Sequence, residues 1–242
     1  MYIQNRLGLI EATETMIAQT RRLDQVANNL ANVDTTGYKR EDMTFWEMIY
    51  KAGNHPDRVG KAIHDVTNLA EGSLQKTNNP LDLAVHGNGY FKVQTPNGER
   101  LTRSGQFLVN NQQQLVTQQG YPVLADGGAL TIDGTDIAVA KDGSVSVDGR
   151  PLGTLDIVTA VNLRDIQKTG GNLFEIANGG AEEPATNTTV NQGYLEKSNV
   201  STMKEMTAMI DLQRAYQSQQ KIINTIDDMD SKAISRVGKL NV

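Results

Sequence analysis

The sequence contains no cysteine, which excludes disulfide bonds, cysteine nucleophiles and thiolate metal sites. Aromatic residues are scarce, at 5% of the chain, and hydrophobic residues make up only 38%. Both fractions are low for a 242-residue chain with one large core. Glycine is plentiful, with 22 residues. We therefore expect many turns and a chain that is either extended or completed by partners.

Long apolar runs are also missing, because no stretch approaches the roughly 18 apolar residues of a membrane span. Residues 1–22 carry acidic and polar side chains throughout and lack the apolar centre of a secretory signal peptide. The net charge is −5, with lysine and arginine spread along the chain. We predict no membrane insertion, no cleaved signal and no nucleic-acid partner.

Both ends of the chain carry apolar residues at alternating spacings of three and four, which is typical of a coiled-coil seam. The N-terminal seam has one polar member and the C-terminal seam has two. The seam positions are Leu9, Ala12, Met16, Gln19, Leu23, Val26, Leu30 and Val33 at one end, and Met209, Leu212, Tyr216, Gln219, Ile223, Ile226, Asp230, Ala233, Val237 and Leu240 at the other.

Start and stop signals accompany both predicted helices. The N-terminal helix should stop near Asp34, because Gly37 supplies the flexible backbone that follows it. Asn199 or Ser201 could cap the C-terminal helix, and Glu205 would favour the positive end of its dipole.

The middle of the chain instead shows short alternating runs, which predict strands at 90–95, 106–109, 114–117, 130–132, 144–147 and 155–161. Four Asp-Gly pairs, beginning at Asp126, Asp133, Asp142 and Asp148, are typical of hairpin turns. We predict an α+β chain, with terminal helices pairing in a coiled-coil-like layer and a central all-β domain. The expected parts are an N-terminal helix (1–37), an extended connector (38–80), the β domain (81–177), a returning connector (178–198) and a C-terminal helix (199–242).

Four blocks of residues carry a specific resemblance. The sequence at 27–39, the β-strand blocks at 80–107 and 115–123, and the segment 193–227 resemble, in this order, the flagellar rod, hook and hook-associated proteins. The signature positions are Asn28, Asn29, Leu30, Asn32, Gly37, Asn199, Val200, Glu205, Met206, Gln213, Arg214 and Tyr216. Chain length and the single β domain favour the flagellar basal-body rod branch. Within it, a proximal rod protein fits best and a distal rod protein is the near alternative.

This resemblance implies a structural subunit that assembles helically, transmits torque from motor to hook and lies in the rod within the periplasmic space. It implies other rod subunits, copies of the same chain and the flagellar type III export apparatus as partners. The predicted assembly interface is Leu9, Met16, Leu23, Val26, Leu30, Met209, Leu212, Tyr216, Ile223 and Ile226. The outer helix faces, with Tyr2, Ile3, Leu7, Met203, Met206 and Ile210, would supply further contacts between subunits.

Catalytic and binding alternatives have little support in the sequence. His55, His64 and His86 have no partner at a metal-binding helical spacing, so we expect no metal, no cofactor and no acid-base role. A carbohydrate hydrolase would need converging carboxylates, whereas the acids here sit mostly in turn signals. A secreted coiled-coil adhesin or binding module would share the seams, but would not be expected to show the matched terminal blocks.

Overall fold

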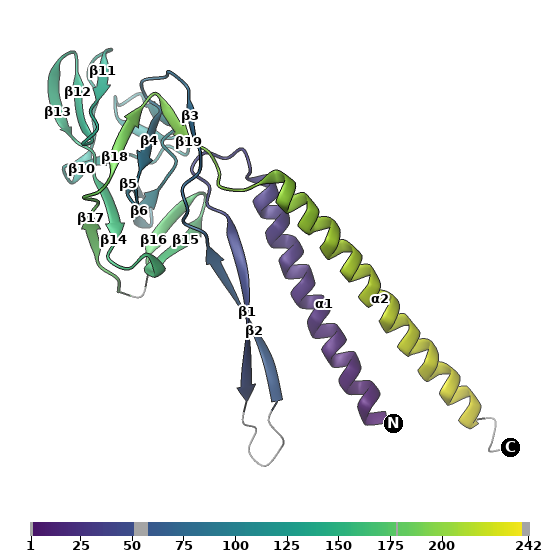
Figure 1. Cartoon of the computed structure of the whole chain (residues 1–242). Coiled ribbons are helices and arrows are strands. Elements are labelled where there is room, and N and C mark those ends of the chain that lie inside the picture. Colours follow the sequence, from purple (N-terminus) through teal and green to yellow (C-terminus); the bar gives the residue numbers. More distant parts are fainter. Residues whose placement is uncertain (1, 51–57, 178, 239–242) are drawn as a thin grey trace. The chain divides into compact units, whose positions relative to one another are not determined.

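A computed structural model describes residues 2–50, 58–177 and 179–238 of the chain (Figure 1). Its internal contacts divide the chain into two compact units. Unit 1 comprises the described parts of Met1–Ala31, Glu41–Val66 and Ser201–Val242. Unit 2 comprises Asn32–Arg40 and the described parts of Thr67–Val200. The chain therefore passes from unit 1 into unit 2 twice, after Ala31 and again after Val66.

Unit 1 is built from the two terminal helices and a pair of strands. Helix α1 spans Tyr2–Ala31 and helix α2 spans Thr202–Gly238, so they are about 45 Å and 55 Å long at 1.5 Å per residue. The two helices contact each other. In Figure 1 they run side by side, with the start of α1 and the end of α2 at the same end of the pair.

The predicted extended connector contributes the strand pair of unit 1. Strands β1 (Glu41–Tyr50) and β2 (Arg58–Thr67) form a two-stranded sheet. The Thr44 hydroxyl donates to the carbonyl of His64 at 3.3 Å across this pair. The extended backbone is thus used for strand pairing, a feature that the polar composition of the segment did not indicate.

Unit 2 is all β apart from one short 3-10 helix among its described residues. Its largest sheet has six antiparallel strands in the order β15-β16-β6-β5-β14-β17. A three-stranded sheet, β11-β12-β13, and the pairs β4–β18, β3–β19, β7–β8 and β9–β10 accompany it. The elements are β3 (Leu74–Lys76), β4 (Leu83–His86), β5 (Tyr90–Thr95), β6 (Gly98–Thr102), β7 (Phe107–Val109), β8 (Leu115–Thr117), β9 (Leu124–Ala125), β10 (Gly128–Ala129), β11 (Ile137–Val139), β12 (Ser144–Val147), β13 (Arg150–Thr154), β14 (Ile157–Ala160), η1 (Leu163–Asp165), β15 (Ile166–Gly170), β16 (Leu173–Ile176), β17 (Glu182–Pro184), β18 (Thr189–Gln192) and β19 (Tyr194–Glu196).

Two apolar cores form because successive side chains of strand β5 point to opposite faces of the sheet. Phe91 and Val93 belong to the larger core, where Phe91 meets Phe107 edge to face at 5.1 Å. Tyr90 belongs to the smaller core and meets Phe174 edge to face at 5.5 Å. The alternation predicted for residues 90–95 therefore holds, and both faces of the strand are covered.

Three of the four Asp-Gly pairs form the predicted turns between consecutive strands. In the pairs that begin at Asp126 and Asp148, both residues have positive φ, as a two-residue type I′ hairpin requires. At Asp142 the aspartate accepts the Ser144 amide proton and the following glycine has φ +87°. The exception is Asp133, where no hairpin forms.

The helix boundaries differ in two details from the sequence-based expectation. Helix α1 ends at Ala31 rather than near Asp34, and a turn closed by Thr35 N–H to the carbonyl of Asn32 follows. Asn199 does not cap α2, because its side chain bonds to other backbone groups described below. Ser201 directly precedes the helix, and its carbonyl accepts the first helical bond from Glu205 N–H at 3.0 Å.

Candidate assembly faces and the buried charge cluster

The predicted seam of α1 lies on the covered face of that helix. Ala12 and Val26 are buried, while Met16, Leu23 and Leu30 are half-buried. The side chain of Leu9 lies outside the described residues. Partial burial is what one partner helix can supply to a seam about 45 Å long, and it leaves apolar surface uncovered.

The seam of α2 shows the same pattern. Its predicted members up to residue 226 are all half-buried, whereas the helix positions between them are mostly exposed. The seam members with described side chains are Met209, Leu212, Tyr216, Gln219, Ile223 and Ile226; those of Asp230, Ala233, Val237 and Leu240 lie outside the described residues. The seam is therefore in contact with α1 but not enclosed by it.

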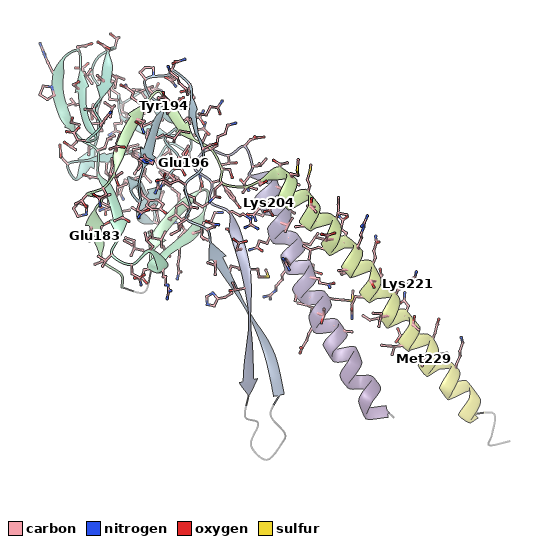
Figure 2. The ribbon with its side chains drawn as sticks, viewed as in Figure 1. Glu183, Tyr194, Glu196, Lys204, Lys221 and Met229 are labelled. Atoms are coloured by element: carbon pink, nitrogen blue, oxygen red, sulfur yellow. The ribbon has the colours of Figure 1, made fainter. Side chains whose placement is uncertain are left out.

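A second apolar stripe occupies the opposite face of α2. Met203, Met206 and Ile210 are spaced three and four residues apart and are 80%, 52% and 50% exposed. Figure 2 shows Lys204, Lys221 and Met229 along the same helix. The corresponding outer residues of α1, Tyr2, Ile3 and Leu7, have side chains outside the described residues. A row of exposed apolar side chains is typical of a surface that contacts another protein.

The signature residue Asn29 ties the last turn of α1 to the first residue of β1. Its amide nitrogen donates to the carbonyl of Glu41 at 2.9 Å, and its amide oxygen accepts the Glu41 N–H at 3.0 Å. Asn29 is buried, so both halves of its amide need these partners. Asparagine suits this position because it offers a donor and an acceptor on one short side chain.

The signature residues Gly37 and Asn199 both make hydrogen bonds between residues 37–40 and the part of unit 2 around Glu196. The Gly37 N–H donates to the carbonyl of Glu196 at 2.7 Å. Asn199 accepts the Arg40 N–H at 2.7 Å and donates to the carbonyls of Asn68 and Ala70 at 2.9 and 2.8 Å. Residues 37–40 and 196–199 are thus joined by a backbone hydrogen bond from Gly37 and by side-chain hydrogen bonds of Asn199.

Three charged residues lie buried beside this junction: Lys39, Arg103 and Glu196, each 2% exposed or less. Lys39 Nζ donates to Glu196 Oε1 at 2.7 Å and to the carbonyl of Ala70 at 2.8 Å. The other carboxylate oxygen, Oε2, lies 3.4 Å from Arg103 Nη1. Figure 2 places Glu196 within the β-rich unit. We call these three residues the charge cluster.

Backbone groups supply further hydrogen bonds to the charge cluster, although the buried Arg103 Nε has no hydrogen-bond partner among the described residues. Arg103 donates to the carbonyl of Val85 at 3.2 Å and to that of Gly87, and its guanidinium lies 4.6 Å from the ring centroid of Tyr90. The Gly72 N–H donates to Glu196 Oε1 at 2.9 Å. Such partners are what buried charges require, since an unpaired charge in an apolar interior is very costly.

Burial shifts the titration of two groups at the cluster. Desolvation lowers the pKa of Lys39, and the ion pair with Glu196 opposes this shift. Desolvation also raises the pKa of Tyr90, against the effect of the nearby Arg103 charge. Both neutral forms are favoured by the same apolar surroundings.

The described residues show no metal-binding or membrane-spanning geometry. There, no three histidine or acidic side chains lie together as a metal ion would require, and no helix has the length and apolar character to cross a membrane. His64 is exposed, and His86 lies 2.9 Å from Glu71 on the surface. His55 lies outside the described residues.

Three family models match the chain. The model described as flagella basal body rod protein matches residues 11–39, and that described as flagellar hook protein FlgE/F/G D1 domain matches residues 84–147. The model described as flagellar basal body rod FlgEFG protein C-terminal matches residues 191–236. Together they cover most of α1, strands β5 to β12 and β19 of unit 2, and most of α2.

Whole-length relatives agree with these models. The chain is 40% identical to the flagellar basal-body rod protein FlgF of Caulobacter vibrioides, over 91% of this chain and 94% of that protein. It is 34% identical to FlgG of the same organism, over 92% and 96%, and 35% identical to FlgG of Bacillus subtilis, over 86% and 90%. The chain belongs to the flagellar basal-body rod protein family.

A member of the flagellar basal-body rod family is a structural protein of the rod and not an enzyme, as the sequence predicted for this chain. Identity is higher to the FlgF relative than to the FlgG relatives, so the chain is FlgF-like, with FlgG as the near alternative. The charge cluster of this rod-family chain draws one residue from each matched segment: Lys39, Arg103 and Glu196.

Sequence reasoning placed Lys39, Arg103 and Glu196 in resembling blocks but did not bring them together. Lys39 and Glu196 are 157 positions apart, and no periodicity links residues at that distance. No local signal singles out the buried charges, because Lys39 is followed by Arg40, Glu41 and Asp42, and Glu196 is followed by Lys197.

The remaining signature residues are spread over both units. Val200 and Glu205 are buried, Leu30, Asn32 and Tyr216 are half-buried, and Asn28, Met206, Gln213 and Arg214 are exposed.

Proposed function

We propose that the chain is a subunit of the proximal part of the rod, within the periplasmic space, and that it assembles with other rod subunits and copies of itself through α1 and α2. The observation that carries this proposal is the pair of long seams that remain only half-buried when α1 and α2 contact each other. Higher identity to FlgF than to FlgG supports the proximal position, and a distal position is the alternative.

Coiled-coil-like pairing of the two helices is the geometry that the seam spacing favours. Residues repeating at three and four positions keep one stripe facing a partner helix over many turns. The polar members Gln19 and Gln219 are half-buried within the stripes. A polar side chain at such a position costs stability but restricts which registers are favourable. We infer that these glutamines help to set the register of the helical layer.

Neighbouring subunits would cover what the helix pair leaves open. Met203, Met206 and Ile210 form an apolar row on the face of α2 opposite the seam, so one helix can contact partners on two sides. Contacts between two different faces are heterologous, and heterologous contacts that do not close into a ring build open helical filaments. A shaft that transmits torque from motor to hook has this symmetry.

The type III export apparatus is the further partner that we propose. Passage through a narrow channel requires a chain that is at least partly unfolded. A chain without cysteine cannot be trapped by disulfides. Two helices whose seams are only half-buried gain little packing energy before assembly. Both properties support export before folding is complete.

Crosslinking of purified basal bodies tests the proposed assembly. Lys204 and Lys221 are exposed on α2 (Figure 2), so a lysine-reactive crosslinker with mass-spectrometric detection should join them to the terminal helices of other rod subunits. Lys221→Arg should remove only its own crosslinks. The control is Lys141→Arg at an exposed position of unit 2, which should leave the crosslinks of Lys204 and Lys221 unchanged. Absence of the chain from purified rods, or crosslinks from α2 that never leave the chain, would overturn the proposal.

A further inference from the structure

The charge cluster contains two cations and one anion. Lys39 and Arg103 are both buried, and Glu196 contacts each of them through a different carboxylate oxygen. The remaining hydrogen-bond partners are neutral carbonyls and the Gly72 N–H, and the ring of Tyr90 lies beside Arg103. The partly exposed Glu71 adds a smaller electrostatic attraction to Lys39, so Glu196 is the one buried carboxylate among these partners. Glu196 is therefore the carboxylate that compensates both buried positive charges, and without it they would repel each other in an apolar interior.

Glu196 belongs to the part of unit 2 that is last in the chain, residues 189–200, which we call the return segment. Strand β18 of this segment pairs with β4, and β19 pairs with β3. Val190 joins the larger core at 1% exposure. The centre of unit 2 therefore lacks a strand, a core side chain and its neutralising carboxylate until the return segment docks.

Residues 37–40, which precede β1, depend on the same event. Lys39 and the backbone of Gly37 both contact Glu196, through its side chain and its carbonyl. Before Glu196 docks, Lys39 and Arg103 have a lower free energy in water than in the interior, because burying a cation without its partner costs several kcal/mol of desolvation free energy. An open unit 2 with both cations in water is then favoured over a closed one.

We propose that the charge cluster is a folding latch, in which docking of Glu196 permits Lys39 and Arg103 to be buried and so closes unit 2 as a whole. Unit 2 then folds only after the return segment has become available. The inference concerns the folding of the single chain and stands apart from the manner of its assembly. The alternative is that Glu196 stabilises only its own segment. Its loss would then destabilise β18 and β19 and leave the rest of unit 2 unaffected.

Hydrogen exchange on the full-length Glu196→Gln variant separates these two cases, because it reports opening strand by strand. The latch predicts that amides in β5 and β6 exchange faster by the same factor as those in β19, on the order of 100-fold or more. The matched control is Glu182→Gln, which removes a partly exposed partner of Lys92 and should change exchange less than about threefold. Faster exchange confined to β18 and β19 would overturn the latch.

A double variant keeps the test informative if Glu196→Gln fails to fold. Lys39→Met together with Glu196→Gln removes one buried cation along with the anion. The latch predicts exchange in β5 at least about tenfold slower than in Glu196→Gln alone, because less uncompensated charge remains. If charge were irrelevant, removing a second hydrogen-bonding side chain would leave exchange as fast or faster. That result would also overturn the proposal.

Discussion

At the scale of single residues, Gly37 shows why the entry into unit 2 permits so little variation. Its φ is +66°, a left-handed conformation that favours glycine. A Cβ atom added there would lie 2.4 Å from the carbonyl carbon of Arg103 and 2.5 Å from the amide nitrogen of Ser104. Both atoms are backbone atoms, so a side chain can fit only if the chain shifts beside the charge cluster.

Gly37→Val should therefore destabilise unit 2 by more than the roughly 1–2 kcal/mol of left-handed strain alone. Thermal melting of the purified chain measures this loss, and swimming in soft agar should be impaired. Gly120→Ala is the control, because Gly120 has φ +85° with nothing within 4 Å of an added Cβ. It should cost only about 1 kcal/mol. Wild-type swimming and melting of Gly37→Val would refute a structural role for this turn.

The titration of Lys39 gives the charge cluster a pH signature. Its folded pKa lies below the ordinary value of 10.5, so between those two pH values the unfolded chain binds more protons than the native one. Stability contributed by this group therefore rises as pH rises through that window. Lys39→Met should lack this rise. Denaturant titrations of both proteins from neutral pH to about 10 would show a difference in the free energy of unfolding that changes with pH. A difference in the free energy of unfolding that is the same at every pH would refute the lowered pKa of Lys39.

At the scale of elements, patterns among neighbouring residues predicted several strands and turns correctly. The alternating runs at 90–95 and 144–147 correspond to β5 and β12. Every second residue of β12 is buried, whereas Tyr90 and Phe91 of β5 are both buried because both faces of that strand are covered. The Asp-Gly pairs at Asp126 and Asp148 adopt the positive φ angles that their turn type needs. In these cases residues close in sequence determine the outcome.

Pairings between distant segments could not be predicted in the same way. Strand β19 pairs with β3 across more than a hundred residues, and each strand has only three. Strands β1 and β2 came from a segment that composition marks as a polar connector. The charge cluster is the extreme case, because its three members share no local pattern. Their burial depends on the assembled surroundings and not on their neighbours in sequence.

The two kinds of element should differ in stability before assembly. Ordering a residue costs about 1–2 kcal/mol of backbone entropy, and the half-buried seams of α1 and α2 recover little of it. Hydrogen exchange on the monomer should therefore be fast over residues 5–30 and 205–235 and slow over β5 and β6. Slow exchange throughout both helices of a monomer of verified size would contradict this expectation.

At the scale of the whole molecule, unit 2 supplies its own apolar cores, whereas the helices of unit 1 leave apolar surface uncovered. This contrast assigns different tasks to the two units. Unit 2 can be stable in a single chain, while the helices gain most of their packing from neighbours. In a filament each defect recurs in every subunit, so a modest loss at one seam weakens many contacts at once.

The variant Leu212→Ala with Ile223→Ala tests this account most directly, by comparing unit 2 melting in the monomer with the number of rods recovered from cells. Each truncation removes a seam side chain worth about 1.5–3 kcal/mol when fully buried. Asp211→Ala with Ser218→Ala, at exposed positions of the same helix, is the control and should assemble normally. The account predicts unchanged melting of unit 2 and few complete rods. Normal rods in the seam variant would contradict assembly through the helical layer.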